Sequence, residues 1–458
     1  MAILQILKRN GKIVAFERIK IFNAILKAAN ASEMQDKETY SKLTEEVCEH
    51  LEKNFPDATS IPSIQDATSI LPSVEDIQDI VEETLIRNNL SAIAKSYILY
   101  RNERKKQRES ESKSDFQHDI IPYKKLWEIL NWNIEHNCES VEKLNHHIHT
   151  GSIQQLILDA EEAYNQDIER AAQSILERKD EIKLVIIAGP SSSGKTTTTI
   201  KLAEHLRKQD VDLIALNIDN YFFNLDCHPQ DEFGDYDFET PEALDLKLIN
   251  QHLRQLLDYE PIQSPRYNFK TGKREETTDT FQLKKNQIIL IDTLHGLHPP
   301  MTESVSSHNK FRLYIETLSQ LKDLNREYTR WTDIRLLRRM MRDHRQRSYN
   351  PKMTIEHWHY VRKSEFKHIF PYLSTVDYIV NGALCYELPV FKKYMFQYFP
   401  NFIKEYENNF ARQDAYIRAK RIYELLKTME DFDKDEEWIP KDSHLREFIG
   451  GSCYTYHI

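Results

Sequence analysis

The chain has 458 residues, of which 40% are hydrophobic and 29% are charged, and its formal net charge is -10. A chain of this length is expected to form about two to three domains, each able to bury a core. The acidic balance argues against broad nucleic-acid binding, because a surface that neutralises phosphates normally carries excess positive charge.

Cysteine usage and hydropathy indicate the compartment. The five cysteines are scattered without close pairing, which suits a reducing cytoplasm. No window approaches the ~18 apolar residues of a membrane span, and the first residues, MAILQILKRNGK, reach charge too early for a signal peptide. We therefore expect a cytoplasmic protein that binds neither membranes nor nucleic acid.

Residues 1–105 are expected to form a small α+β unit. Two short apolar runs flank Asn10-Gly11, a dipeptide typical of hairpin turns. Ser73 stands three residues before Asp76, the spacing of a capping box at a helix start. Helical spacing of apolar residues predicts helices over 18–29, 39–53, a stretch opening at Ser73, and 91–104.

A charged, apolar-poor run over residues 102–114 interrupts the pattern, as expected of a linker or a fading helix end. The following residues, to about 180, have helical spacing and carry several aromatic side chains. We assign residues 106–180 to a linker and helical connector.

The most informative stretch is 182–206, IKLVIIAGPSSSGKTTTTIKLAEHL. An apolar run of strand length is followed by a glycine- and serine-rich loop and then by helical spacing, which is the order of a P-loop. Such a loop turns backbone N–H groups toward phosphates at a helix start, so the motif predicts binding of a nucleoside triphosphate, here ATP. The expected nucleotide-binding residues are Gly189, Ser191, Ser192, Ser193, Gly194, Lys195, Thr196 and Thr197.

Short apolar runs then alternate with helical stretches, which is typical of a parallel sheet with helices on both faces. We expect an α/β P-loop kinase domain over residues 181–395, followed by a helical C-terminal extension over 396–458. The expected strands after the first cover 211–218, 287–291, 311–315 and 376–380.

Two aspartates end strands of this predicted sheet, at the edge where ligands of open α/β folds bind. Asp219 is our candidate general base and Asp292 our candidate Mg²⁺ ligand, together with the Thr196 hydroxyl. A turn former at Asp219 and a satisfied strand-end carboxylate at Asp292 are the alternatives.

The segment TDIRLLRRMMRDHRQR, residues 332–347, places Arg335, Arg338, Arg342 and Arg345 roughly along one stripe of a helix. Stacked like charges repel one another unless an anion lies among them. We therefore expect Arg335 to contact substrate, and Arg338 and Arg342 to act with Lys195 on the transferring phosphoryl group. A solvated charged helix face is the alternative.

The first unit resembles an ATP-cone, the nucleotide-sensing domain of ribonucleotide reductases and some kinases. KRNGKIVAFERIKIFNAILKA, SVEDIQDIVEETL and AKSYILYRNERKKQR carry the resemblance. It implies that Lys8, Arg9 and Lys20 hold the phosphates of a regulatory ATP or dATP. A solvated edge of the hairpin is the alternative.

Residues 140–458 resemble the uridine kinase and phosphoribulokinase family, and most closely its bacterial nucleoside-kinase branch. GPSSSGKTT, NIDNYF, GDYDFETPEALDL, PRYNFKTGKR, HGLHP, RLLRRMMRDHRQRS and the LREFIGGS tail carry this resemblance. It implies Asp219 as the base, Arg338 and Arg342 as lid arginines, and the following acceptor-binding residues: Tyr221, Asp237, Tyr267 and Phe269.

The sequence departs from the family pattern at three positions. Gly272 stands where pyrimidine-specific kinases have a base-reading histidine, Asp292-Thr293 replaces a Glu-Gly pair, and Ser348 replaces a frequent glycine. The first departure leaves base selectivity open, and the second shortens the reach to the metal by one methylene.

The favoured function is an ATP- and Mg²⁺-dependent kinase that phosphorylates a primary hydroxyl, most plausibly of a nucleoside, in a homo-oligomer regulated through the ATP-cone. Two alternatives stay open. The acceptor is a sugar phosphate or another phosphorylated metabolite, or the chain is a nucleotide-sensing regulator with a weak kinase domain.

Overall fold

The computed structural model describes residues 3, 5–7, 13–30, 37–56, 71–88, 90, 92–98, 101, 121–229, 236, 239–269, 271–346, 350–407, 409 and 412–455. The chain divides into two compact units, residues 1–117 and 118–458. The domain boundaries that we expect at residues 105, 180 and 395 stay predictions.

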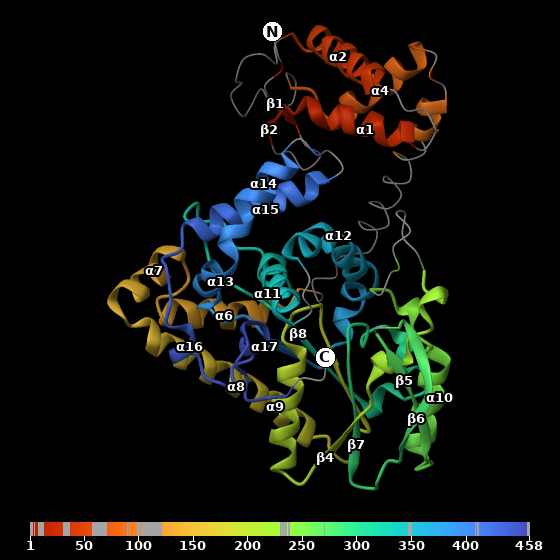
Figure 1. Ribbon diagram of the computed structural model, residues 1–458, viewed down its shortest axis with the longest axis vertical. Coiled ribbons are helices and arrows are strands. Elements are labelled where there is room, and N and C mark those ends of the chain that lie inside the picture. Colours follow the sequence, from red (N-terminus) through yellow and green to blue (C-terminus); the bar gives the residue numbers. More distant parts are fainter. Residues whose placement is uncertain are drawn as a thin grey trace. The chain divides into compact units, whose positions relative to one another are not determined.

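The N-terminal unit contains a two-stranded hairpin and a set of helices (Figure 1). Strand β1 (Gln5–Leu7) pairs antiparallel with β2 (Ile13–Ala15), as the Asn10-Gly11 dipeptide predicts, and the turn itself lies outside the described residues. The labelled helices are α1 (Arg18–Asn30), α2 (Lys37–Asn54) and α4 (Val74–Arg87).

Local sequence fixes the start of α4. The Ser73 side chain accepts a hydrogen bond from the Asp76 amide, and the Asp76 carboxylate accepts one from the Ser73 amide, so the predicted capping box is confirmed. Apolar residues of all three helices, such as Ile25, Val47 and Leu85, are fully buried in one core.

The second unit is built on a five-stranded sheet in which every adjacent pair of strands is parallel. The predicted α/β layer is therefore confirmed. In spatial order the strands are β4 (Asp212–Ala215), β7 (Gln287–Thr293), β3 (Leu184–Ala188), β8 (Lys310–Glu316) and β9 (Tyr378–Asn381).

Helices cover both faces of the sheet, because alternate residues of its central strand enter different cores. Val185 and Ile187 join a core with α8, α9, α11 and the C-terminal helices, while Leu184 and Ile186 join a core with α10. The helices are α6 (Tyr123–Glu135), α7 (Val141–Thr150), α8 (Ile153–Leu176), α9 (Lys195–Arg207), α10 (Leu246–Leu257), α11 (Trp331–Gln346), α12 (Pro351–His368), α13 (Glu387–Met395), α14 (Phe399–Tyr406), α15 (Gln413–Lys427), α16 (Asp435–Trp438) and α17 (Arg446–Ile449).

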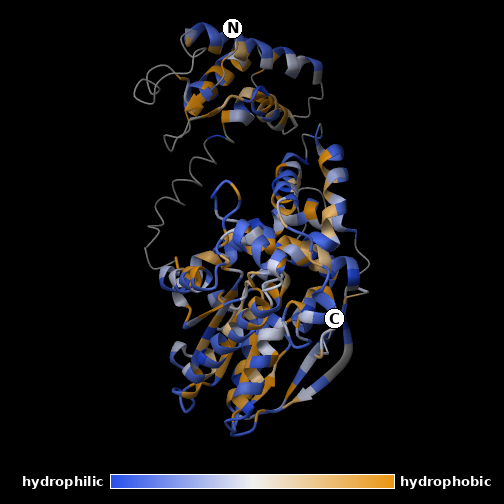
Figure 2. Ribbon diagram, turned by 90° about the vertical axis from the view of Figure 1, so that its left-hand side faces the viewer, coloured by the Kyte–Doolittle hydropathy of each residue, from blue (hydrophilic) through white to orange (hydrophobic). Residues whose placement is uncertain are grey.

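Figure 2 shows hydrophobic residues concentrated on the strands and on the helix faces that cover them, and hydrophilic residues on the outer helix faces. No helix in the described ranges combines the length and the apolarity that crossing a bilayer requires.

A separate two-stranded sheet is not evident from the sequence pattern. Strands β5 (Ile262–Asn268) and β6 (Lys273–Phe281) form an antiparallel hairpin. Its turn contains Gly272 at φ +66°, a left-handed conformation that favours glycine. This hairpin carries the PRYNFKTGKR motif.

Candidate phosphate and acceptor site

The P-loop begins where β3 ends and closes into α9, which starts at Lys195. A β-carbon at Gly189 would lie 2.5 Å from the Ile315 carbonyl oxygen, so only glycine allows this close approach. The side-chain hydroxyls of Ser192 and Ser193 are buried and have no hydrogen-bond partner among the described residues. Buried hydroxyls normally have partners, so this loop fits a polar ligand such as phosphate.

Arginines of α11 hold the loop from the side of its carbonyl groups. The Arg338 guanidinium donates to the carbonyl oxygens of Ser193 at 3.0 Å and Ser192 at 3.3 Å, and that of Arg339 donates to the Ser191 hydroxyl at 2.8 Å. In a planar trans peptide the C=O and the next N–H point in opposite directions. Binding these carbonyls therefore directs the following amides away from the arginines.

Two arginines of α11, Arg335 and Arg338, form buried ion pairs. Arg335 meets Glu365 through two bonds of 2.6 and 3.0 Å, and Arg338 meets Glu387 through two bonds of 2.7 Å. Both guanidinium groups are fully buried. Two members of the predicted arginine stripe are thus neutralised by carboxylates of the protein and not by an anionic ligand, which the sequence analysis did not anticipate.

The expected substrate role of Arg335 and phosphoryl role of Arg338 stay predictions, because the described conformation directs both side chains at glutamates. Arg342 is more accessible: its side chain is 17% exposed, and its Nε lies 3.8 Å from the Asp343 carboxylate. Arg342 is therefore more accessible to a ligand than Arg335 and Arg338, and Arg345 is exposed.

The two predicted strand-end aspartates come close to the P-loop lysine. Asp292 lies on β7 beside Ile187 of β3. The strand expected over 211–218 is shorter, because β4 ends at Ala215, and Asp219 lies in the 3-10 turn Ile218–Tyr221 that follows it. Burial raises the pKa of Asp292 to about 6, Lys195 opposes this shift, and the negative charges of Asp219 and Glu447 add to it. Asp292 therefore lies within electrostatic reach of both Lys195 and Asp219.

This group of side chains suits a small hard cation beside phosphates. The Thr196 side chain is exposed at the start of α9 and Asp219 is exposed as well, and hydroxyl and carboxylate oxygens are the donors that Mg²⁺ prefers. The described part of the chain contains no cluster of three His, Cys, Asp or Glu side chains arranged for a metal. Mg²⁺ in phosphoryl transfer does not require one, since water and phosphate oxygens complete its shell.

One carboxylate at this site was missed by the sequence analysis. Glu447, in the LREFIGGS tail, accepts hydrogen bonds from the Thr197 amide at 3.3 Å and from the Thr197 hydroxyl at 3.0 Å. No local pattern connects residues 250 positions apart, so the tail motif itself was the only available signal.

Two of the predicted acceptor residues belong to the hairpin region: Tyr267 lies on β5 and Phe269 follows it. Tyr267 is buried and its hydroxyl has no partner among the described residues, while Phe269 is 60% exposed with its ring 5.0 Å from that of Tyr267. Phe222 packs beside both, with ring centroids at 5.6 and 6.0 Å. These three rings form an aromatic cluster, of which Phe222 was not predicted.

Another predicted acceptor residue, Tyr221, is not part of this cluster. Tyr221 is fully buried and its hydroxyl bonds to His252 at 2.8 Å, so it reads as a core residue here. Asp237 lies outside the described residues. At Gly272 a β-carbon would lie 2.8 Å from that of Leu225, so the observed packing leaves no space for a histidine.

The predicted regulatory residues are described only in part. Lys8 and Arg9 lie outside the described residues. Lys20 is exposed at the start of α1 and pairs with Glu17 at 2.6 Å. Its proposed role in holding a regulatory nucleotide stays a prediction.

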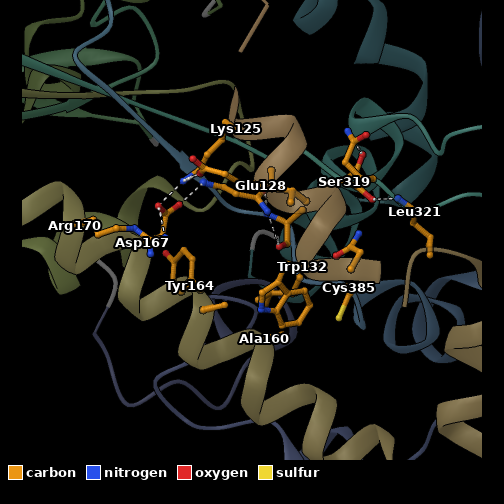
Figure 3. Close-up of a pocket in the computed structure, with 17 residues that line it drawn as sticks. Lys125, Glu128, Trp132, Ala160, Tyr164, Asp167, Arg170, Ser319, Leu321 and Cys385 are labelled. Atoms are coloured by element: carbon orange, nitrogen blue, oxygen red, sulfur yellow. Dashed lines mark hydrogen bonds and ion pairs between the residues drawn. The ribbon is translucent and has the colours of Figure 1, made fainter. Parts of the chain in front are cut away.

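A cavity of about 130 Å³ lies beside the P-loop helix, between α6, α8 and the loops that follow β8 and β9 (Figure 3). Trp132 and Tyr164 lie in its wall, and the Tyr164 hydroxyl bonds to the Thr198 hydroxyl of α9 at 2.7 Å. This volume is close to that of a cavity that holds a single benzene ring, roughly 150 Å³.

The charges of this cavity cancel. Lys125 pairs with Asp167 at 2.5 Å and lies 3.7 Å from Glu128, and Arg170 lies 3.3 Å from Asp167. Such a lining offers no excess positive charge to a phosphate. We therefore assign phosphate binding to the P-loop and not to this cavity.

Comparison with known proteins gives two domain matches. Residues 184–388 match the model of the phosphoribulokinase/uridine kinase family, and residues 4–71 and 67–106 match that of the ATP cone domain. Both resemblances seen in the sequence are thereby confirmed.

Two curated relatives carry the name uridine kinase. That of Bacillus pumilus (strain SAFR-032) is 29% identical over 172 residues, covering 38% of this chain and 72% of the relative. That of Borrelia duttonii (strain Ly) is 27% identical over 218 residues, covering 46% of this chain and 95% of the relative. A solved structure titled as a possible uridine kinase from Bacillus stearothermophilus shares 20% identity at a TM-score of 0.28, over 32% of this chain and 79% of that chain.

Proposed function

We propose that this chain, which combines a kinase domain of the phosphoribulokinase/uridine kinase family with an ATP cone domain, transfers the γ-phosphoryl group of ATP to a primary hydroxyl of a nucleoside. The observation that supports the proposal is that Asp292 of β7 lies at the P-loop helix, where it accepts a hydrogen bond from the Thr199 hydroxyl at 3.4 Å and interacts with the charges of Lys195 and Asp219. Phosphoryl transfer needs a phosphate cradle, charge neutralisation and a group that receives the hydroxyl proton.

Each need has a candidate residue. The amides at the start of α9 and the Lys195 ammonium bind the phosphate chain. Asp219 is exposed at the sheet edge, where its carboxylate can accept the proton of the attacking hydroxyl. Thr196 and Asp292 would hold Mg²⁺, which when bound neutralises charge on the phosphate oxygens.

The acceptor is proposed from the aromatic cluster of Phe222, Tyr267 and Phe269 and from the names of the relatives. A partly exposed ring such as Phe269 offers a stacking surface for a planar base. The buried Tyr267 hydroxyl offers a hydrogen bond that a base edge can complete. Neither feature selects one base over another.

The substrate class is tested by steady-state transfer from ATP to uridine, cytidine, adenosine, guanosine and ribose 5-phosphate. The proposal expects kcat/KM for at least one nucleoside to exceed that for the sugar phosphate by tenfold or more, roughly the 1.4 kcal/mol of one good contact. If only the sugar phosphate is phosphorylated, the proposed kinase activity stands, but the proposed nucleoside acceptor is wrong. No turnover with any acceptor would support the nucleotide-sensing alternative, which the Asp292-Thr293 pair motivates.

Regulation by the ATP cone domain is a further part of the proposal. A nucleotide bound there changes the rate only if it binds two states of the protein differently, and we propose that these states differ in oligomerisation. Initial rates and sedimentation measured with and without dATP test this. A rate and a subunit number that dATP leaves unchanged would remove the regulatory role.

A further inference from the structure

The segment from Asp442 to Gly450 packs directly on the P-loop and its helix. Asp442 pairs with Lys201 of α9 at 3.0 Å. A β-carbon on Gly194 would lie 3.1 Å from the His444 ring, and the Phe448 ring lies 5.1 Å from the Arg338 guanidinium. This tail segment is therefore a wall of the phosphate site.

Within the tail segment, Glu447 makes the contact that bears on ligand binding. Its carboxylate is largely buried, and one oxygen accepts from both the amide and the hydroxyl of Thr197, which is itself fully buried. The residue that precedes α9 is Gly194, which has no side chain to bond to an amide of the first turn. Glu447 supplies that bond from the far end of the chain.

The Thr197 amide belongs to the set of donors that a P-loop presents to phosphates. In this motif the amides of the loop and of the helix start cradle the α- and β-phosphates, and the lysine reaches the β- and γ-phosphates. Thr197 lies two residues beyond Lys195, toward the α end of the chain of phosphates. A carboxylate and a phosphate are both anionic acceptors, so they compete for this amide.

The surrounding charges also oppose simultaneous occupancy. Asp292 interacts with the like charges of Asp219 and Glu447 and with the opposite charge of Lys195. A triphosphate adds further negative charge at short range, where repulsion is strong in a partly buried site.

We propose that Glu447 is an internal competitor for the nucleotide: its carboxylate occupies the α-phosphate position in the nucleotide-free enzyme and leaves it when ATP binds. The inference rests on the proposed function, since it takes ATP as the ligand. Leu445 and Phe448 are fully buried on either side of Glu447. The backbone of the tail segment therefore stays anchored while the Glu447 side chain rotates away from Thr197.

Direct binding of ATP, AMP and adenosine to the full-length protein tests the proposal by calorimetry. Because a hydrogen bond to a charged group is worth about 1.5–3 kcal/mol, Glu447→Ala is expected to tighten ATP and AMP binding by about tenfold or more. Glu447→Gln keeps the size of the side chain and a weaker acceptor, so it should give a smaller gain and guards against misfolding of the alanine variant. Adenosine has no phosphate, and its affinity should not change.

Glu424→Ala is the control, because Glu424 is an exposed carboxylate on α15 and its removal should leave all three affinities unchanged. If both Glu447 variants bind ATP as tightly as wild type or more weakly, Glu447 does not compete with the nucleotide and instead supports the loop structurally. If neither wild type nor variants bind ATP, the proposed function fails as well.

Discussion

Two groups of charged side chains flank the phosphate loop, and they are balanced differently. On the carbonyl side, Arg335 and Arg338 each meet a buried glutamate through two hydrogen bonds. Near the start of α9, Asp292 interacts with the opposite charge of Lys195 and with the like charges of Asp219 and Glu447, and burial raises its pKa to about 6. In the first group each guanidinium is paired with a carboxylate, whereas in the second like charges lie near one another.

This difference indicates that the arginines stabilise the P-loop, whereas the carboxylates near α9 take part in the reaction. A buried ion pair with good geometry fixes a structure and gives a ligand no reason to bind. A buried carboxyl group with a raised pKa, such as Asp292, destabilises the folded state when it is ionised, and such groups concentrate at functional sites. The comparison predicts that removing a charge lowers stability in the first group and activity in the second.

A large effect is expected for Lys195→Met. It removes the cation that opposes the charge of Asp292 and that we propose binds the phosphate chain, so the transfer rate should fall by about 10²–10³-fold, as for loss of one preorganised electrostatic donor. The measurement is initial rate with radiolabelled ATP. The control is Lys208→Met, an exposed position just after α9, which should keep the wild-type rate. If Lys195→Met retains the wild-type rate, Lys195 does not bind the transferred phosphate.

Next in size is the effect of Arg338→Met on stability. The change leaves the Glu387 carboxylate buried without its guanidinium, which typically costs about 3–5 kcal/mol of unfolding free energy. Urea denaturation measures it, with the exposed Arg330→Met as control. If Arg338→Met instead unfolds like wild type and loses only activity, the arginine acts on the phosphoryl group, as the family resemblance implies.

Part of this site could be predicted from the sequence. The P-loop, the parallel sheet and the position of Asp292 near the end of β7 follow from local patterns, because strand, loop and helix signals are short-range. The end of β4 does not, since the strand stops at Ala215 and Asp219 lies in a later 3-10 turn. The partners of Arg335 and Arg338 do not, since Glu365 and Glu387 lie 30 and 49 residues away and reach them only after packing.

The positions of the acceptor-binding residues also could be predicted only in part. Tyr267 and Phe269 are found from their motif, but the β5–β6 hairpin is not, because its sequence lacks a clear alternation of apolar and polar residues. Tyr221 follows Asp219 by two residues and yet points into the core toward His252. Only tertiary packing decides which neighbouring aromatic ring reaches the surface.

A smaller effect is expected for Phe269→Ala on acceptor affinity. Stacking of a base on an aromatic ring contributes about 1–3 kcal/mol, and a ring that is 60% exposed should lie at the low end. KM for the nucleoside should rise several-fold with kcat nearly unchanged. Tyr123→Ala, an exposed ring on α6, should alter neither constant, and an unchanged KM in Phe269→Ala would remove the aromatic cluster from the acceptor site.

The smallest effect, and one of opposite sign, is expected for Asp292→Asn on stability. The pKa of Asp292 is raised to about 6 in the folded protein from roughly 3.9 when unfolded, so the folded state binds more protons between these values and loses stability as pH rises through them. Asparagine carries no charge. The variant should therefore be more stable than wild type at pH 8, by about 1 kcal/mol given the partial exposure of the site.

That gain should shrink as the pH is lowered toward 5, where the wild-type carboxyl becomes protonated. Thermal unfolding of both proteins at the two pH values gives the comparison, and transfer activity of Asp292→Asn should fall throughout. Equal stability at pH 8 would mean that Asp292 is already satisfied within the protein, as a structural strand-end carboxylate would be.

We propose above all that Asp219 and Asp292 serve phosphoryl transfer. Asp219→Asn tests this most directly when the transfer rate and the ATP affinity are measured on the same preparation. Loss of a general base typically lowers a rate by about 10²–10⁴-fold, and a neutral amide at this exposed position should not weaken ATP binding. We predict that large loss of transfer with ATP affinity retained. Transfer at the wild-type rate would contradict the assignment of Asp219 as the group that accepts the hydroxyl proton.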